Sequence, residues 1–486
     1  MISFETQCNL VKTKLNGQLY APYQKEGVQW MLSMENQTDG PKGGFLCDEM
    51  GLGKTIQTIS TILGNPQKNT LIIVPKSIVM QWKEEINKFA PSLSVFVYDG
   101  PDRTKNTRDL YDHDIVISTY NLLIEKTKIL HGIIWGRVIL DEAHEIRNAE
   151  SVKFKSALQL KSEIRWLLTG TPVFNTMYDF INLCTFLGIP RSYSQGMTKN
   201  VKDTYILRRT KNDLKEFNAN LELPPCYFEN VELEMFPEEK KLYKHVFLES
   251  QELIREILKT TRNINMRNMQ FLECLLRARQ VMIWPQMYLD GMAKKCEDVP
   301  EIWKGRSKKM ETLLNMISEH PEEKAIVFCQ FKSEMNHIRS KLTCPVFRID
   351  GSVSKEDRIH QLQEFKHAPQ NSVFLIQIKA GGQGLNIQCA SRVYITAPSW
   401  NPATELQAIG RCHRTGQTRN VHVKKLVYVN EPEFPSVEES MMALQGHKSL
   451  ISAEVLNDKR LETQIPTRNK TSGSISIAAI KNIFRV

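Results

Sequence analysis

Two segments far apart in the chain carry residues that could handle the phosphates of a nucleotide. The first is Asp48–Thr55, with the sequence Asp-Glu-Met-Gly-Leu-Gly-Lys-Thr, and the second is Gln407–Arg414, which contains two arginines. Backbone N–H groups of a glycine loop at a helix N-terminus bind phosphate, and the planar fork of an arginine grips phosphate oxygens. The pair predicts a site that is completed when distant parts of the chain meet, as in the conversion of ATP hydrolysis into motion between domains.

The first segment has the context of a P-loop. It follows the apolar segment Gly43–Cys47 and precedes a helical pattern over Ile56–Leu63, and strand, glycine loop and helix are the required order. Lys54 is expected to hold the β- and γ-phosphates of ATP, and Thr55 to ligate Mg²⁺. The other predicted cofactor contacts are the remaining loop residues Asp48, Glu49, Met50, Gly51, Leu52 and Gly53.

One position of this loop departs from the generic pattern. A P-loop begins with glycine, where this chain has Asp48. The alternative interpretation is a chance Gly-Lys-Thr at the start of an ordinary helix.

An acidic pair lies between the two phosphate-handling segments. Asp141 and Glu142 follow the apolar run Val138–Leu140, and ligands of parallel sheets are met at strand ends. Asp141 is expected to hold Mg²⁺, and Glu142 to polarise the attacking water as a general base. The alternative is a helix-capping aspartate beside a solvated glutamate.

We expect Arg411 and Arg414 to lie on a helix and, being three residues apart, to share one of its faces. An arginine finger supplies roughly 10³–10⁵ in rate. The alternative is a pair of ordinary surface arginines.

Composition sets limits on the class of protein. The 486 residues carry a net charge of +10 and a pI of about 8.9, just short of the usual flag for a nucleic-acid binder. Apolar runs are too short for a membrane span, and Met1–Glu5 does not begin a signal peptide. None of the ten cysteines forms Cys-x-x-Cys, which argues against a zinc module and a disulfide framework. We therefore expect no zinc, no membrane partner, and a reducing compartment: nucleus, cytoplasm or a viral replication site.

Two series of short β-rich runs alternate with helical patterns and predict an α/β fold with two parallel sheets. The first series is 70–75, 95–98, 115–119, 137–141 and 166–169, and the second is 324–331, 346–349, 373–378, 392–396 and 421–429. Helices are expected over 242–258, 269–282, 435–456 and 475–484, with a loop at 467–474. Leu223-Pro224-Pro225 marks a boundary, because proline disfavours helix in the residue before it.

The motifs together resemble those of the Swi/Snf-type ATPases of helicase superfamily two, over Leu19 to Lys448. In the first half the matching segments are Tyr23–Trp30, Asp48–Thr55, Ile73–Pro75, Gln81-Trp82, Asp141–His144, Leu168–Pro172 and Asn175. In the second half they are Val327–Phe331, Ile349–Ser352, Lys379–Asn386, Trp400–Pro402 and Gln407–Gln417. Leu207–Lys211 and Leu223–Pro225 are particular to the Swi/Snf type, and the aspartate that opens the P-loop is that family's own form. Ala397–Ser399 departs from the family, which usually has an aspartate just before the Trp-Asn-Pro segment.

The resemblance implies a fold of two RecA-like parallel-sheet lobes with helical insertions between them and a helical C-terminal tail. The expected divisions are 1–175 for the first lobe, 176–306 for the insertions and linker, 307–430 for the second lobe, and 431–486 for the tail. Gln24 is expected to contact the adenine. The implied DNA contacts are Lys76, Ser118, Thr119, Gln330, Lys379 and Asn386.

The implied function is an ATP-dependent translocase on double-stranded DNA, which remodels DNA or protein–DNA complexes without extensive strand separation. Nucleosomes or other DNA-bound proteins are the implied further partners. Some repair translocases of this family carry a zinc-binding insertion after a segment like Leu275–Gln280. Here Trp284–Lys308 contains only Cys296, so ubiquitin-ligase activity is not expected.

Three alternatives remain: a strand-separating DNA helicase, an RNA helicase, and a non-catalytic DNA-binding scaffold. The Asp-Glu-Ala-His box supports the RNA helicase, and the two Swi/Snf-specific segments oppose it. The scaffold reading needs a relict ATP site, against which Lys54, Glu142 and Arg414 speak.

Overall fold

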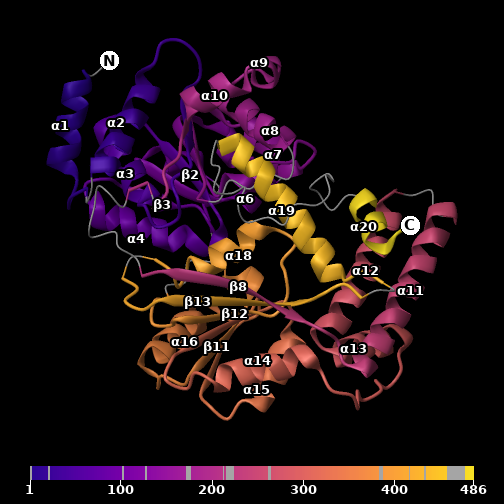
Figure 1. Ribbon diagram of the computed structural model, residues 1–486. Helices are drawn as coiled ribbons and strands as arrows, with labels where there is room; N and C mark the ends of the chain where they lie inside the picture. The colour runs from indigo at the N-terminus through magenta and orange to yellow at the C-terminus, as the bar shows by residue number, and fades with distance from the viewer. Residues whose placement is uncertain are drawn as a thin grey trace. The chain divides into compact units, whose positions relative to one another are not determined.

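The chain divides into two compact units, each with its own parallel sheet (Figure 1). Unit 1 is Met1–Glu222 with Ile451–Glu462, and unit 2 is Leu223–Leu450 with Thr463–Val486. The computed structural model describes residues 3–19, 22–100, 103–104, 106–125, 128–170, 177–211, 213–214, 224–260, 264–381, 387–414, 416–431, 434–456 and 477–486. The expected loop at 467–474 lies outside these residues.

The division differs from the four parts expected from the sequence. The boundary falls at Leu223, where the two prolines predicted a break, so 176–306 is shared between the units. The reason is packing: buried side chains of the helices after Leu223, such as Phe247 and Phe271, join one core with Val327 and Leu375 of the second sheet. Val437 and Ile483 of the expected tail belong to the same core.

The sheet of unit 1 has seven parallel strands in the order β3-β4-β2-β5-β6-β1-β7. Its strands are β1 (Lys42–Leu46), β2 (Thr70–Val74), β3 (Val95–Val97), β4 (Ile115–Thr119), β5 (Ile134–Asp141), β6 (Lys161–Leu168) and β7 (Ile206–Leu207). The five strands predicted in this half are confirmed, although β5 and β6 begin earlier. β7 was not predicted, because two residues carry no periodicity.

Helices cover both faces of this sheet. In β2, Leu71 and Ile73 face one core and Ile72 and Val74 the other, which explains why the strand reads as a continuous apolar run. One core takes side chains of α2 (Pro22–Asn36), α3 (Lys54–Gly64) and α4 (Val79–Phe89), and the other those of α6 (Tyr120–Leu123), α7 (Val152–Leu158) and α8 (Met177–Leu187). The remaining elements are α1 (Phe4–Lys14), η1 (Lys76–Ile78), α5 (Thr107–Tyr111), η2 (Ile129–Gly132), η3 (Ala143–Ile146), α9 (Arg191–Gly196) and α10 (Thr198–Tyr205).

The sheet of unit 2 has six parallel strands in the order β10-β11-β9-β12-β13-β8. They are β8 (Cys226–Leu233), β9 (Ala325–Cys329), β10 (Val346–Ile349), β11 (Val373–Gln377), β12 (Arg392–Ile395) and β13 (Val421–Tyr428). The five predicted strands are confirmed. β8 was missed because it is an edge strand that leaves Tyr227 and Phe228 exposed, so it lacks a buried apolar run.

Helices cover the second sheet unequally. One core contains Phe365 of α16 (Lys355–His367) and Ala408 of α18 (Pro402–Ile409). The opposite core is larger and is shared by α11 (Pro237–Thr260), α12 (Ile264–Ile283), α13 (Pro285–Cys296), α14 (Lys308–Ser318), α15 (Lys332–Lys341), α19 (Val437–Leu456) and α20 (Ile477–Phe484). The four helices predicted in this part of the chain are confirmed. The described helices include none that is both long and apolar enough to cross a membrane.

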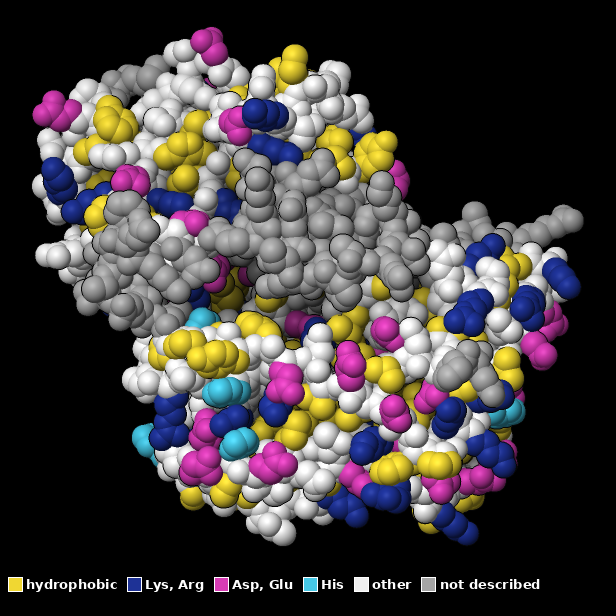
Figure 2. Space-filling view, in the orientation of Figure 1, with side chains coloured by type: hydrophobic (Ala, Val, Ile, Leu, Met, Phe, Trp, Pro, Cys, Tyr) yellow, Lys and Arg dark blue, Asp and Glu magenta, His cyan; other side chains and the backbone are white. Residues whose placement is uncertain are grey.

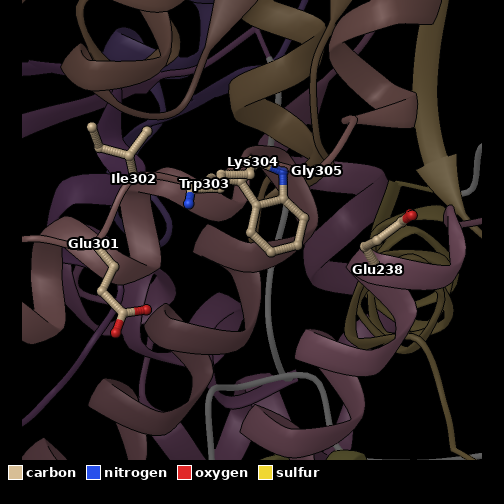
Figure 3. A pocket seen from close by; sticks show the side chains of 6 residues that line it. All are labelled: Glu238, Glu301, Ile302, Trp303, Lys304 and Gly305. Carbon is tan, nitrogen blue, oxygen red and sulfur yellow. The ribbon is translucent and has the colours of Figure 1, made fainter.

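The visible surface of unit 2 mixes acidic and basic side chains without one dominant sign (Figure 2). A hollow of about 520 Å³ lies on this unit between Glu238, at the start of α11, and the loop Glu301–Gly305 before α14 (Figure 3). None of its lining residues is among the predicted site residues.

Candidate active site

The P-loop connects β1 to α3 through two glycines with positive φ. Gly51 has φ 94° and Gly53 has φ 79°, a left-handed conformation that residues with a Cβ rarely adopt. A Cβ on Gly53 would also lie 2.6 Å from Nε2 of Gln24. Lys54 is the first residue of α3, and Thr55, half-buried, follows in its first turn.

Asp48, the residue that departs from the generic P-loop, is fully buried and pairs with Arg209. Asp48 Oδ1 accepts hydrogen bonds from the backbone N of Arg209 at 3.1 Å and from its Nε at 3.0 Å. Asp48 Oδ2 accepts from Arg209 Nη2 and, at 3.0 Å, from Gln57 Nε2. The guanidinium also donates to the carbonyl of Tyr23 and lies 5.2 Å from its ring centroid. Asp48 therefore fixes the loop to a segment 161 residues later.

β7 and the segment after it run beside the start of the P-loop. Cys47 N donates to the carbonyl of Leu207 at 2.7 Å, and Glu49 N donates to that of Arg209 at 2.9 Å. Lys211 N donates to Glu49 Oε2 at 2.9 Å. Sequence reasoning noted Leu207–Lys211 as a family feature but missed Arg209 as a residue of the site. The only signal in the sequence was the family segment Leu207–Lys211 that contains it.

Lys54 lies between the P-loop and the end of β6. Its Nζ donates to the carbonyl of Asp48 at 2.8 Å. A Cβ placed on Gly170, just after β6, would be 2.9 Å from the same Nζ. Because β6 separates β1 from β5 in the sheet, this contact brings the carboxyl ends of neighbouring strands to one place.

The acidic pair lies at the carboxyl end of β5. Asp141 Oδ2 accepts a hydrogen bond from Trp82 Nε1 at 2.8 Å, and Oδ1 accepts one from the backbone N of Glu142 at 3.0 Å. Burial, reinforced by the charge of Glu142, raises the pKa of Asp141 to about 6, although the bond from Trp82 and the charge of Lys54 oppose this. Trp82 is thus a further residue that orients the carboxylate.

Glu142 has a left-handed backbone, with φ 52° and ψ 51°. Such a conformation is uncommon for glutamate and costs free energy, and it recurs at functional sites. The carboxylate Oε2 lies 3.4 Å from Nδ1 of His144. The carboxylate of the general-base candidate thus lies beside His144 of the same turn.

Gln24 lies against the P-loop, although its predicted partner is the adenine. Its Nε2 donates to the carbonyl of Leu52 at 3.3 Å, and the hydroxyl of Tyr23 donates to the same carbonyl at 3.2 Å. Tyr23 and Leu52 form a small buried cluster with Leu214. The structure thus brings Gln24 and the loop together, while the roles of Gln24, Met50 and the other loop residues as nucleotide contacts stay predictions.

The predicted DNA contacts of unit 1 differ in exposure. Lys76 is exposed at the start of η1, after β2. Ser118 is fully buried, and its hydroxyl donates to the carbonyl of Tyr98 at 3.0 Å. Thr119 is also buried, at the end of β4. DNA contact by these residues stays a prediction, and for Ser118 and Thr119 it would require the strand end to open.

Two predicted DNA contacts of unit 2 are described. Gln330 follows β9 and is half-buried, with Nε2 donating to the carbonyl of Ala397 at 3.1 Å. Lys379 is exposed on the short helix α17 (Ile378–Gly381). Asn386, like Thr171–Pro172 and Asn175 of the coupling motif, lies outside the described residues.

The two arginines do not lie on a helix, which corrects the prediction that they share a helix face. α18 ends at Ile409, and Arg411 and Arg414 lie in the turns that follow. Cys412 packs into the core of unit 2, and the carbonyl of Arg411 accepts a hydrogen bond from Ile387 N at 3.0 Å. After Ile409 the backbone tightens, since Arg411 N and Cys412 N donate to carbonyls three residues earlier, those of Ala408 and Ile409, and the side chain of Cys412 enters the core.

The fold and the site define an α/β protein of the P-loop class with two units. The P-loop and an acidic pair lie at the carboxyl edge of the first sheet, and unit 2 has a second parallel sheet and a turn that carries two arginines. Comparison with known families agrees. The SNF2-related domain matches residues 23–287, and the helicase conserved C-terminal domain matches residues 308–416. The first match spans more than half of the chain, so the chain belongs to the SNF2-related family.

Curated relatives are similar along most of this chain. The DNA repair protein RAD5B of Arabidopsis thaliana is 28% identical over 88% of this chain and 46% of the relative. The ISWI chromatin-remodeling complex ATPase ISW1 of Saccharomyces cerevisiae is 28% identical over 96% of this chain and 43% of the relative. An ATP-dependent helicase of Mycoplasma pneumoniae is 31% identical over 90% and 42%. The chain thus spans about half the length of the curated relatives it matches.

A solved structure, the Sulfolobus solfataricus SWI2/SNF2 ATPase core in complex with dsDNA, is 29% identical and covers 97% of both chains, with a TM-score of 0.42.

Proposed function

We propose that this chain is a DNA-dependent ATPase that translocates along double-stranded DNA. The observation that carries the proposal is the meeting of Lys54, Gly170 and the P-loop at one edge of the first sheet, with the charge of Lys54 acting on Asp141. Relatives named as a DNA repair protein and a chromatin-remodeling ATPase support a DNA substrate.

Unit 1 supplies the residues that bind and cleave ATP. Lys54 neutralises the β- and γ-phosphates, and free N–H groups at the start of α3 bind them. Glu142 polarises the attacking water as a general base. The two acids have different partners, since Asp141 accepts a hydrogen bond from Trp82 and Glu142 lies 3.4 Å from His144, and this supports different roles for them.

Mg²⁺ fits the donors available in unit 1. Thr55 and Asp141 offer a hydroxyl and a carboxylate, the hard oxygen ligands that this ion takes. Asp141 is buried beside a second acid, and burial together with the charge of Glu142 raises its pKa to about 6. These two residues would hold Mg²⁺, which would neutralise negative charge on the phosphates.

Unit 2 supplies Arg411 and Arg414, which stabilise charge that develops on the phosphates during transfer. Hydrolysis requires both units, so each turnover couples the chemistry to motion between them. Lys76, Gln330 and Lys379 grip the DNA backbone, and such phosphate contact carries no sequence information. Nucleosomes or other DNA-bound proteins are the objects that such a motor would displace.

The proposal is tested by comparing ATP turnover with duplex DNA, single-stranded DNA and RNA. Duplex DNA should stimulate most, and affinity should fall with salt at a log–log slope of about −0.9 per phosphate neutralised. ATP should drive displacement of a third strand from a DNA triplex but no unwinding of a forked duplex. Fork unwinding without triplex displacement would instead establish a strand-separating helicase, and stimulation by RNA alone an RNA helicase.

A further inference from the structure

The loop after β12 is held by three different parts of unit 2. Three consecutive carbonyls of this loop each accept a hydrogen bond from a different element. Gln330, after β9, donates to the carbonyl of Ala397 at 3.1 Å. Arg279 of α12 donates through Nη2 to that of Pro398 at 3.0 Å, and Gln445 of α19 donates through Nε2 to that of Ser399 at 2.5 Å.

The same loop is joined to α18, the short helix that leads to the arginine turn. Glu405 of α18 accepts a hydrogen bond on Oε1 from the backbone N of Ser399 at 2.6 Å. Gln445 Nε2 donates to the same oxygen at 2.7 Å, and Lys425 Nζ of β13 lies 2.6 Å from Oε2. Glu405, Ser399 and Gln445 are all buried, so each of these bonds is shielded from water.

α19 is itself fixed where it begins. Glu438 pairs through Oε1 with Nζ of the fully buried Lys309 at 2.5 Å and accepts from the backbone N of Tyr428 at 2.9 Å through Oε2. Val437 N donates to the hydroxyl of Tyr243 at 3.1 Å. Gln445 lies seven residues after Glu438 on the same helix. Its position is therefore set by a helix whose first turn is bonded to Lys309, Tyr428 and Tyr243.

We propose that Gln445 is a positioning residue for the arginine turn. This inference rests on the proposed function, because it assigns the turn a role in ATP turnover. A helix as short as α18 is marginal by itself, so its placement depends on Glu405 and the loop before it. Glu405 lies six residues before Arg411, and only Gly410 separates the end of α18 from Arg411, so little chain lies between to absorb a shift.

Loss of the Gln445 amide would leave the Ser399 carbonyl unpaired and Glu405 short of one donor, both in a buried place. Unpaired buried acceptors are costly, so the loop and α18 would rearrange together. The expected consequence is a misplaced arginine turn with the phosphate-binding loop of unit 1 unchanged. Turnover should then fall while ATP affinity stays constant.

The test uses the 486-residue chain with Gln445→Leu. This substitution removes the amide and places an apolar side chain of similar size at the same buried position of α19. We expect kcat to fall about tenfold, as for the loss of roughly one buried hydrogen bond in the transition state, with an unchanged KM for ATP. Gln445→Met provides a second variant of similar volume if the first does not fold. Met441→Ala is the control for lost core packing, since Met441 lies on the same helix and is buried in the same core.

The decisive comparison is made in the background of Arg414→Ala, with single-turnover rates. If Gln445 acts through the turn, Gln445→Leu causes no further loss once Arg414 is absent. If Gln445→Leu lowers the single-turnover rate as much in the Arg414→Ala background as it does alone, the positioning role is overturned. It is also overturned if Met441→Ala, at an equally lowered Tm, shows the same loss of kcat. If Arg414→Ala alone keeps full turnover, the role of the turn in the proposed function fails. If Arg414→Ala abolishes turnover and Gln445→Leu does not reduce it, only the positioning role fails.

Discussion

At the scale of single residues, Lys54 and Glu142 separate binding of ATP from its hydrolysis. Lys54→Ala removes the cation next to the phosphates, so turnover should fall by orders of magnitude. Glu142→Gln keeps the side-chain shape but cannot accept a proton, so ATP should still bind while hydrolysis falls about 10²- to 10⁴-fold. Nucleotide affinity and turnover are measured for both variants. Near-normal turnover in either one would exclude its assigned role.

Substitution of Asp48 tests whether its buried pair with Arg209 stabilises the protein, or whether the glycine of the generic P-loop serves equally well at this position. Asp48→Gly restores the generic glycine, yet it leaves the guanidinium of Arg209 without its buried partner. Removing one member of a buried pair costs about 3–5 kcal/mol, so the free energy of unfolding should fall by that order. Urea denaturation measures it.

The matched control for Asp48→Gly is Glu163→Ala, which breaks a surface pair with Lys42 at 2.6 Å. Exposed pairs contribute about 0–1 kcal/mol. Equal effects of the two substitutions would show that Asp48 contributes no more than a surface charge.

At the scale of elements, a buried ion pair joins the layers of unit 1. Arg137 of β5 donates through Nε to Oε1 of Glu35 on α2 at 2.6 Å, and both side chains are fully buried. The indole of Trp166 on β6 donates to the same carboxylate at 2.8 Å, and Asn65, after α3, donates to it at 2.7 Å. One carboxylate therefore links α2, the end of α3 and two strands.

This pair predicts strong non-additivity. Arg137→Met should lower the free energy of unfolding by about 3–5 kcal/mol, because Glu35 is then buried without its cationic partner. Adding Glu35→Leu should recover part of that loss, since no charge is then stranded. Equilibrium denaturation of the two single variants and the double variant measures the coupling. Additive losses would contradict the structure.

Sequence patterns predicted the elements whose causes are local. β2 and β4 are apolar on both faces, so their runs end close to the observed limits. β8 escaped prediction because its edge position leaves it without a buried pattern. Arg411 and Arg414 were expected on a helix, but α18 ends at Ile409 and the side chain of Cys412 packs into the core of unit 2.

In the candidate site, too, the features with local causes were predictable and the long-range contacts were not. The order of β1, P-loop and α3 is a short-range motif and was predictable. The pairing of Asp48 with Arg209 and of Trp82 with Asp141 joins positions far apart, and a single sequence holds no periodicity that reveals such partners. The same holds for the contact between Gln445 and Ser399.

At the scale of the whole molecule, the two-unit mechanism predicts a specific defect for Arg414→Ala. ATP binding should persist, because the P-loop belongs to unit 1. Turnover with DNA should drop by roughly 10³- to 10⁵-fold, as for a lost arginine finger. Equilibrium nucleotide binding and steady-state turnover are measured on the same preparation. A variant that lost ATP binding but hydrolysed normally at saturation would contradict the mechanism.

The bond between Asp48 and Arg209 also bears on how the chain acquires its nucleotide site during synthesis. The phosphate-binding loop leaves the ribosome early, but its buried carboxylate meets its partner 161 residues later. At roughly 5–20 residues per second, translation of that interval takes about 8–30 s. For that time the nascent loop carries an unsatisfied aspartate, so a nascent chain stalled before Arg209 should retain less ATP than one stalled after β8.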